Sequence, residues 1–337
     1  MNPSQAPYLI AEIGQAHDGS LGILFSYIDA LAKTGVNAIK LQMHLAHAES
    51  SSQEPFRVPF AVQDVSRFDY WQRTGFTLLQ WKAIKKRCDD VNIDFLCSPF
   101  SNMAVDWLEQ IGVSQYKIGS GEVNNLLLLN KIAQTGKPII LSSGMSSFDE
   151  LDQTVAFLKS KNCTFSILQC ATAYPTLPNQ YGFNVIQELR NRYHVKIGFS
   201  DHSARPETSV AAAALGAEII EFHAVFDRQL FGPDSIASLT ITEISNMVIA
   251  IKNIANALQN PVDKSNNDDY KAVKLIFEKS LAVNKDLKSG HVLTFGDLEA
   301  KKPSNHGISA NKFESVLGRK LKQSIQKWDF LNDDDLI

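Results

Sequence analysis

The stretch Tyr8-Leu-Ile-Ala-Glu-Ile13 precedes a helical pattern that begins at about Leu21, and Ala38-Ile-Lys-Leu-Gln-Met43 follows that pattern. Each apolar run has the length and composition of a β-strand, and the segment between them has the spacing of an amphipathic helix. The stretch therefore predicts one strand, one helix and a second strand, which is the unit of an α/β protein.

Six further strand-like runs follow the first two, and most of them precede a helical pattern. They cover residues 93–97, 115–118, 138–141, 164–170, 195–199 and 218–223. Eight such units predict a (β/α)8 TIM barrel, whose active site lies where the strands end and the βα loops begin. A doubly wound open sheet is the structural alternative.

The overall charge excludes some classes of partner. The 337 residues carry 33 Lys and Arg against 36 Asp and Glu, a formal charge of -3, so no global basic field favours nucleic acid or a membrane surface.

The four cysteines form no Cys-x-x-Cys pair, which favours reduced thiols. Residues 1–7 lack a signal-peptide pattern, and no long uncharged apolar run occurs. We therefore expect a soluble, cytoplasmic protein.

Composition also divides the chain. Residues 1–260 hold the eight units, residues 261–275 are polar and turn-rich and predict a linker, and a smaller β-rich domain should occupy residues 276–337. Within the first domain, residues 44–70 lack a clear period, which indicates a long second βα loop that covers or shapes a site. The small domain contains a weak echo, in which Val292-Leu293 precedes Asp297-Leu298 as Phe330-Leu331 precedes Asp335-Leu336.

Polar side chains recur at the carboxyl ends of the predicted strands. The run Tyr116-Lys-Ile-Gly-Ser-Gly-Glu122 is the most informative, because strand alternation points Lys117 inward and the glycines let backbone amides approach a ligand. Lys40 would also point into the barrel. With these two lysines, four serines at strand ends could form a cradle for a phosphate and a carboxylate: Ser98, Ser120, Ser142 and Ser200. Lysines simply paired with acids are the structural alternative.

Two histidines end successive predicted strands, His202 in Gly198-Phe-Ser-Asp-His-Ser203 and His223 in Glu218-Ile-Ile-Glu-Phe-His223. Neutral imidazoles that project to one point could hold a divalent metal with open coordination positions, although two hydrogen-bonded core histidines would have the same spacing. Glu12 and Glu122 are the carboxylates best placed for proton transfer, and either could instead neutralise a lysine.

With these residues laid out, the chain resembles the sialic acid synthase (N-acetylneuraminate synthase) family over nearly its whole length. The similarity lies in the joint order of several motifs rather than in any one of them. These are Ile10-Ala-Glu-Ile-Gly14, His17-Asp-Gly19, Ile39-Lys-Leu-Gln42, Ser98-Pro-Phe-Ser101, Tyr116 to Glu122, Pro138-Ile-Ile-Leu-Ser-Ser-Gly-Met145, Tyr174-Pro-Thr176, Phe199-Ser-Asp-His202 and Gly232-Pro-Asp234. The tail from about Leu281 resembles the antifreeze-like (SAF) domain of these enzymes.

The resemblance implies a transferase that condenses phosphoenolpyruvate with the open-chain aldehyde of an N-acylated hexosamine, giving a nine-carbon 2-keto acid and phosphate. It implies that the six cradle residues bind phosphoenolpyruvate, and that His202 and His223 bind Mn²⁺ or Mg²⁺. Glu122 would activate water or move its proton, and Glu12 would orient or protonate the sugar. Gln42, Tyr174 and Asp234 would bind sugar hydroxyls.

The family also implies a domain-swapped homodimer, in which the small domain contributes an arginine to the partner's acyl-sugar site. The matching position here is Lys302, which lacks the planar guanidinium fork. Thr172 and Ala16 stand where the family often has asparagine. All three departures concern the sugar side, so the sugar's identity stays open: N-acetylmannosamine, or a 6-deoxy diacetamido sugar.

Two other functions compete with this reading. A related synthase could act on a shorter aldose phosphate, as in Kdo-type condensation, but the small capping domain and the lack of an evident second phosphate site argue against it. A sugar-binding barrel without turnover is the other, and the presence of Glu122, His202 and His223 argues against that.

Overall fold

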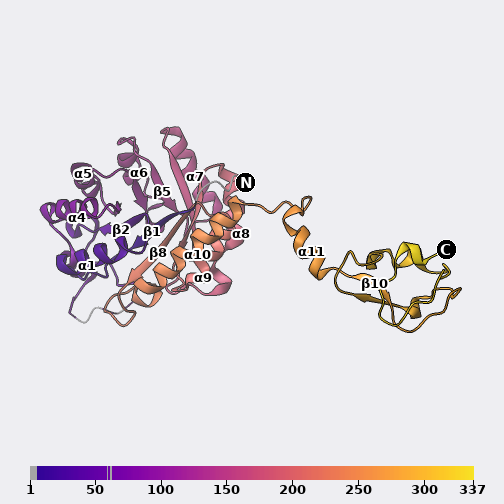
Figure 1. The fold of residues 1–337 in the computed structure, drawn as a ribbon. Helices are drawn as coiled ribbons and strands as arrows, with labels where there is room; N and C mark the ends of the chain where they lie inside the picture. The colour runs from indigo at the N-terminus through magenta and orange to yellow at the C-terminus, as the bar shows by residue number, and fades with distance from the viewer. Residues whose placement is uncertain (1–5, 59, 61–62) are drawn as a thin grey trace. The chain divides into compact units, whose positions relative to one another are not determined.

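The computed structural model describes residues 6–58, 60 and 63–337. The chain forms two compact units, with the division between Pro261 and Val262 (Figure 1). Each unit has its own hydrophobic core.

The first unit is built on eight parallel strands. These are β1 (Tyr8–Glu12), β2 (Ala38–Met43), β3 (Asp94–Pro99), β4 (Tyr116–Ile118), β5 (Ile139–Ser142), β6 (Phe165–Cys170), β7 (Ile197–Asp201) and β8 (Ile219–Val225). Hydrogen bonds join them in the order β3-β2-β1-β8-β7-β6-β5-β4, and the two ends of this path, β3 and β4, lie side by side. The strands therefore form a nearly closed barrel, which confirms the predicted TIM-barrel class and excludes the open doubly wound sheet.

Helices surround this barrel (Figure 1). They are α1 (Leu21–Ala32), α2 (Ala46–Glu49), α3 (Arg67–Thr74), α4 (Leu78–Asp90), α5 (Asn102–Ile111), α6 (Leu126–Ala133), α7 (Phe148–Ser160), α8 (Phe183–Tyr193), α9 (Pro206–Ala214) and α10 (Ile241–Gln259). Several begin at a capping box, as at Ser147 with Glu150 and Thr240 with Glu243, where each side chain satisfies a free backbone N–H of the other residue. The caps fix where each helix begins after its loop.

Strand alternation separates the two faces of the barrel wall. Outward side chains such as Leu9, Leu41 and Phe222 pack against the helices in one large core. Inward side chains fill the lower barrel with apolar groups: Ile10, Ala38, Leu96, Ile140, Leu168 and Ile219. Gly198 completes this layer, because a Cβ there would lie 2.3 Å from the carbonyl oxygen of Ile219. The filled floor leaves space only toward the carboxyl ends of the strands.

The second unit is small and mostly irregular. It contains α11 (Lys271–Phe277) and the antiparallel pair β10 (Ser280–Val283) and β11 (Leu298–Lys301), with further isolated bridges. The antiparallel pairing agrees with the predicted small β domain, and α11 places a helix in part of the segment interpreted as a linker. Asp297 and Asp335 accept hydrogen bonds from the backbone N–H groups of Thr294 (2.8 Å) and Asn332 (2.9 Å). The sequence echo therefore corresponds to two short turns capped in the same way.

Every predicted strand boundary lies within two residues of the observed one. The second βα loop is less irregular than expected, because α2 and the start of α3 lie within residues 44–70.

Among the described residues, no helix is both long enough and apolar enough to cross a membrane.

Candidate active site

A cavity of about 320 Å³ lies over the carboxyl ends of the barrel strands. Its volume falls in the range of small-molecule sites. Twelve of the fourteen residues predicted for the site line it: Glu12, Lys40, Gln42, Ser98, Lys117, Ser120, Ser142, Tyr174, Ser200, His202, His223 and Asp234. They come from seven of the eight strands, and from the loops after β4, β6, β7 and β8, so that all eight βα units contribute. The barrel therefore gathers residues that lie up to 222 positions apart in the sequence.

Both inward lysines have carboxylate partners in the cavity wall. The parallel register places Lys40 opposite Glu12, and the two side chains form a buried ion pair. Lys117 Nζ lies 3.4 Å from Glu221 Oε1 and donates a hydrogen bond to Ser142 Oγ at 2.6 Å. Glu12 therefore neutralises a lysine, which was the structural alternative to a role in proton transfer. Glu221 on β8, which the sequence analysis did not select as a site residue, has the same role at Lys117.

Glu221 is the central carboxylate of the cavity floor. Burial alone would raise its pKa, but the positive charges of Lys117 and Lys40 outweigh burial and hold the pKa well below its usual range. Oε1 accepts a hydrogen bond from Ser200 Oγ at 3.1 Å, whereas Oε2 has no partner. Ser98 Oγ is likewise buried without a partner. Buried polar atoms that lack partners in a cavity wall mark where a ligand would complete the hydrogen bonding.

The two histidines face each other near the cavity floor, with ring centroids 5.1 Å apart. Nδ1 of His202 lies 3.1 Å from the carbonyl oxygen of Ala171, which fixes the ring and leaves Nε2 free. Burial, aided by the nearby positive charges, lowers the pKa of His223 well below its ordinary value, so this imidazole is neutral. Burial would lower the pKa of His202, but Cys170 and the Ala171 carbonyl outweigh burial and raise it, so a metal ion bound there would displace any proton from the ring. The two imidazoles could then supply two nitrogen ligands to a divalent metal. No group of three metal-ligating side chains occurs among the described residues, so such a site would keep open positions.

The mouth of the cavity contains an arginine that the sequence analysis missed. Arg57 lies in the second βα loop, with its guanidinium 4.0 Å from the centre of the Tyr174 ring and 2.5 Å from Asp234 Oδ1. The predicted sugar residues Tyr174 and Asp234 are thus joined by one cation. Aromatic residues of the same loop and of α3 complete the wall, among them Phe56, Phe60 and Trp71. The long loop therefore shapes the site, as its length predicted.

Two predicted site residues do not lie in the cavity wall. Glu122 ends the short 3-10 helix Ser120–Glu122, and its carboxylate accepts a hydrogen bond from Asn125 Nδ2 at 2.7 Å instead of lining the cavity. Its role in activating water or moving a proton stays a prediction. Lys302 belongs to the second unit, where its Nζ lies 4.7 Å from the centre of the Phe277 ring.

Ser120 and Cys170 form a further contact in the wall, with Ser120 Oγ 3.6 Å from Cys170 Sγ. Cys170 Sγ also lies 3.8 Å from Nδ1 of His202. The sequence indicated only that the four cysteines are reduced thiols. Its position at the inward-facing end of β6 was the available signal.

Comparison with known proteins identifies the family. The NeuB family matches residues 27–263 and the SAF domain matches residues 278–337. The chain is 33% identical to N,N'-diacetyllegionaminic acid synthase of Campylobacter jejuni, over 92% of this chain and 94% of that one. It is 29% identical to pseudaminic acid synthase of Helicobacter pylori, over 98% of both chains.

Among solved structures, the N-acetylneuraminic acid synthetase of Leptospira borgpetersenii superimposes with a TM-score of 0.70 at 30% identity, covering 80% of this chain and 90% of that one. The family match extends over most of the barrel, and the similarity to the synthases extends over both units. The chain therefore belongs to the NeuB family and carries a C-terminal SAF domain.

Proposed function

We propose that this protein condenses phosphoenolpyruvate with an N-acylated hexosamine, giving a nine-carbon 2-keto sugar acid and phosphate. One observation carries the proposal: two buried lysines and several inward hydroxyls share a single cavity with two adjacent histidines. Relatives named as synthases of legionaminic and pseudaminic acid support the same reaction class. Because they differ in product at similar identity, they leave the sugar open.

In this proposal the phosphate and carboxylate of phosphoenolpyruvate occupy the lysine side of the cavity. Lys40 and Lys117 would donate charge-assisted hydrogen bonds to them, and further hydrogen bonds would come from the hydroxyl groups of Ser98, Ser120, Ser142 and Ser200. C3 of phosphoenolpyruvate attacks the aldehyde carbon, water adds at C2, and phosphate leaves from the resulting tetrahedral carbon. The buried walls would exclude other water from this carbon.

His202 and His223 would hold the divalent metal, Mn²⁺ or Mg²⁺. When bound, the cation would polarise the aldehyde oxygen and make its carbon more electrophilic. Imidazole donors favour Mn²⁺ over Mg²⁺, because Mg²⁺ prefers oxygen ligands. Gln42, Tyr174 and Asp234 would bind the sugar, and Glu12 would orient it. Glu122 has no part in the proposal, because its carboxylate lies outside the cavity wall.

The proposal predicts phosphate release that depends on an acylated amino sugar. Purified protein with Mn²⁺ and phosphoenolpyruvate should release phosphate when N-acetylmannosamine or a 6-deoxy diacetamido hexose is added, and mass spectrometry should detect a nine-carbon keto acid. Release no faster than the sugar-free control across the panel would contradict the proposal. Release only with aldose phosphates would assign the protein to the Kdo-type alternative, and sugar binding without release would leave a binding protein.

We also propose a homodimer in which Lys302 from the SAF unit of one subunit reaches the partner's sugar. Light scattering should then give about twice the chain mass of 37.4 kDa. Lys302→Ala should raise KM for the sugar by about tenfold, since a charged hydrogen bond is lost, while KM for phosphoenolpyruvate stays within twofold. Lys302→Arg should retain sugar binding. A monomer, or a Lys302→Ala variant with unchanged KM for the sugar, would contradict the proposal.

A further inference from the structure

A buried glutamine in the cavity wall has no hydrogen-bond partner for its side chain. Gln15 lies in the loop after β1 and is only 6% exposed, yet it lines the cavity together with Glu12 and Gln42. Within the described ranges 6–58, 60 and 63–337, no residue hydrogen-bonds to its amide. A side-chain amide has two N–H donors and a carbonyl acceptor, and buried polar groups normally have partners. Gln15 therefore has unused hydrogen-bonding capacity that faces the cavity.

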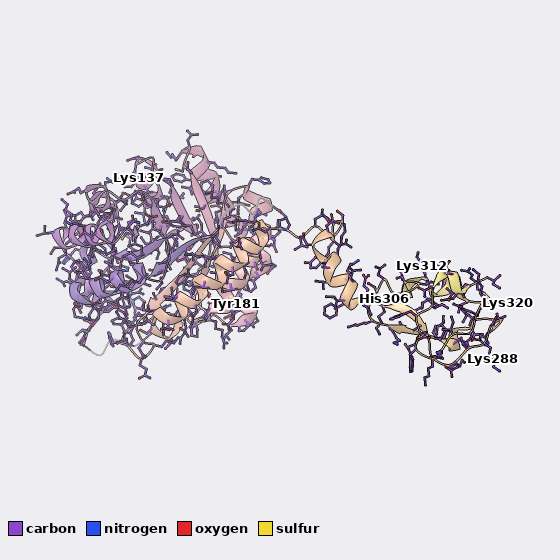
Figure 2. The ribbon with its side chains drawn as sticks, in the orientation of Figure 1. Lys137, Tyr181, Lys288, His306, Lys312 and Lys320 are labelled. Atoms are coloured by element: carbon purple, nitrogen blue, oxygen red, sulfur yellow. The ribbon has the colours of Figure 1, made fainter. Side chains whose placement is uncertain are left out.

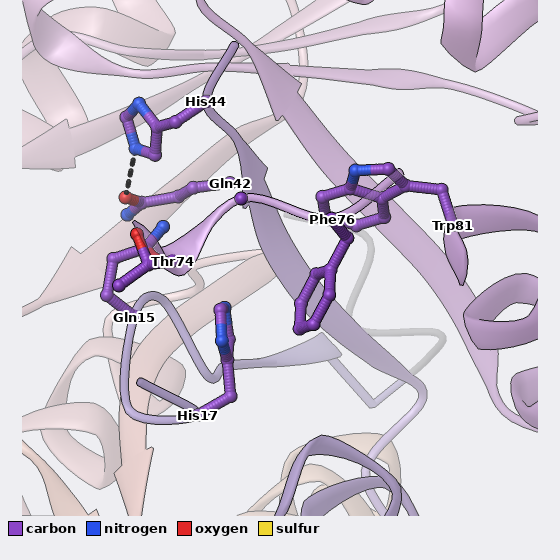
Figure 3. Close-up of a pocket in the computed structure, with 8 residues that line it drawn as sticks. Gln15, His17, Gln42, His44, Thr74, Phe76 and Trp81 are labelled. Carbon is purple, nitrogen blue, oxygen red and sulfur yellow. Dashed lines mark hydrogen bonds between the residues drawn. The ribbon is translucent and has the colours of Figure 1, made fainter. Parts of the chain in front are cut away.

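The surroundings of Gln15 restrict where a partner can come from. On one side it borders a narrow recess, which it shares with Gln42 and Thr74, and its amide points toward the amide of Gln42 (Figure 3). This recess has no room for a water molecule. A partner for the Gln15 amide must therefore enter from the cavity, which has room for a small molecule.

The neighbours of Gln15 place it on the sugar side of the proposed active site. A Cβ at Gly14 would lie 3.8 Å from both Gln42 Nε2 and Glu12 Oε1, so the loop passes directly beside these two side chains. The Gln42 amide is already engaged, since its two ends lie 2.7 Å from Glu12 Oε1 and 3.0 Å from His44 Nε2. Gln15 is thus the amide of this wall that remains available to a ligand.

The backbone that carries Gln15 is held in place without a ligand. Its carbonyl accepts a hydrogen bond from the N–H of Asp18 at 2.9 Å, and Asp18 Oδ1 accepts one from Arg73 of α3 at 2.9 Å. A Cβ at Gly19 would lie 2.8 Å from the carbonyl oxygen of Arg73, so the loop packs directly on the end of α3. A side chain on such a backbone loses little conformational freedom when it binds a ligand.

The contact with α3 also brings aromatic groups to the same part of the wall. α3 contributes Tyr70 and Trp71 to the cavity, and Thr74, one turn further along, lines the recess with Gln15. An acylamino group has an N–H and a carbonyl, which match the acceptor and donors of an amide, and an acyl methyl, which matches an apolar surface. A sugar hydroxyl would use the amide but not the aromatic surface. An amide beside an aromatic wall is therefore complementary to an acylamino group.

We propose that Gln15 determines specificity for the acceptor sugar by hydrogen-bonding to one of its acylamino groups. The inference rests on the proposed function, to which it adds a residue that contacts substrate. A site built to hydrogen-bond a group rejects analogues that leave the site's polar atoms unpaired. The protein should therefore prefer an acylated amino sugar to the same sugar with a hydroxyl in that position, and Gln15 should be a source of this preference.

The first test measures binding without turnover. Calorimetry in the presence of Mn²⁺ and inorganic phosphate, with no phosphoenolpyruvate, gives the affinities for N-acetylmannosamine, a 6-deoxy diacetamido hexose and mannose. The parent should bind an acylated sugar more tightly than mannose. Gln15→Met keeps the length of the side chain and removes its donors and acceptor, so it should weaken binding of the preferred acylated sugar by about tenfold and that of mannose by less than twofold. A parent without this preference, or a Gln15→Met variant that retains it in full, would overturn the proposal.

The second test measures turnover and separates contact from structure. Gln15→Met should raise KM for the acylated sugar by about tenfold while KM for phosphoenolpyruvate stays within twofold, because the lysine side of the cavity is unchanged. Gln72→Met removes the amide of an exposed glutamine on α3 that does not line the cavity, and it should stay within twofold of the parent for both substrates. A Gln15→Met variant in which both KM values rise equally would show a structural effect and overturn the contact.

The binding result does not depend on turnover. If the protein binds an acylated sugar with a preference that depends on Gln15 but releases no phosphate, the proposed function fails and the assignment of Gln15 as a sugar contact stands. If it releases phosphate and Gln15→Met has the KM and the sugar preference of the parent, the function stands and the assignment fails.

Discussion

Replacement of Lys117 by methionine should lower kcat/KM for phosphoenolpyruvate by about a thousandfold or more. Methionine retains much of the buried volume but removes the charge that pairs with Glu221 and the donor that serves Ser142. Truncating one partner of a buried, hydrogen-bonded charge pair with a ligand typically costs about 2 to 5 kcal/mol of binding, and each 1.4 kcal/mol is a tenfold change. Steady-state kinetics with saturating sugar would measure the loss.

Two companion variants separate binding from folding. Lys137→Met removes a lysine that lies at the periphery of the barrel unit and pairs with Glu109, and its activity should stay within twofold (Figure 2). Lys117→Met combined with Glu221→Gln removes the unpaired carboxylate, so thermal stability should recover while phosphoenolpyruvate binding does not. A folded Lys117→Met protein with less than a tenfold loss would contradict the assignment of this lysine to the anion cradle.

Changing either histidine of the facing pair to asparagine should remove tight Mn²⁺ binding. With only two protein nitrogens available, the loss of one leaves a single ligand, and we expect affinity to fall by at least a hundredfold. Turnover should fall with it. Electron paramagnetic resonance of free Mn²⁺ during a titration would measure the affinity without any assay of activity.

His194→Asn provides the matched control for His202→Asn and His223→Asn. His194 is exposed at the end of α8 and has a positive φ of 55°, a conformation that asparagine tolerates well. Its Mn²⁺ affinity should equal that of the parent. Unchanged affinity in His202→Asn and His223→Asn would remove the metal assignment.

The sequence predicted the barrel and much of the cavity wall for one physical reason. In a buried parallel strand, side chains alternate, so Lys40 and Gln42 on β2, or Glu221 and His223 on β8, must share the inner face. The filled barrel interior then restricts a ligand to the carboxyl ends of the strands. Residues within strands could therefore be assigned to the site without knowing any distance.

What the sequence could not predict depends on turns and on register. Glu122 follows β4 by only four residues, but the intervening 3-10 turn ends the alternation, and its carboxylate turns toward Asn125. Arg57 lies in a loop where no period indicates direction. The pairing of Glu12 with Lys40 follows from the register of β1 on β2, which composition does not specify.

The pairing of the cavity's lysines has a thermodynamic consequence. Glu12 and Glu221 already cancel the charges of Lys40 and Lys117, and Asp234 cancels Arg57, so these six groups are together electroneutral. Arg67, which also lines the cavity, pairs with Glu54. A ligand with a phosphate and a carboxylate would bring negative charge that no unpaired cation among these groups offsets. A divalent cation that binds with it would supply the missing charge. Cation and anion should then each strengthen the binding of the other by the same factor, as linkage requires.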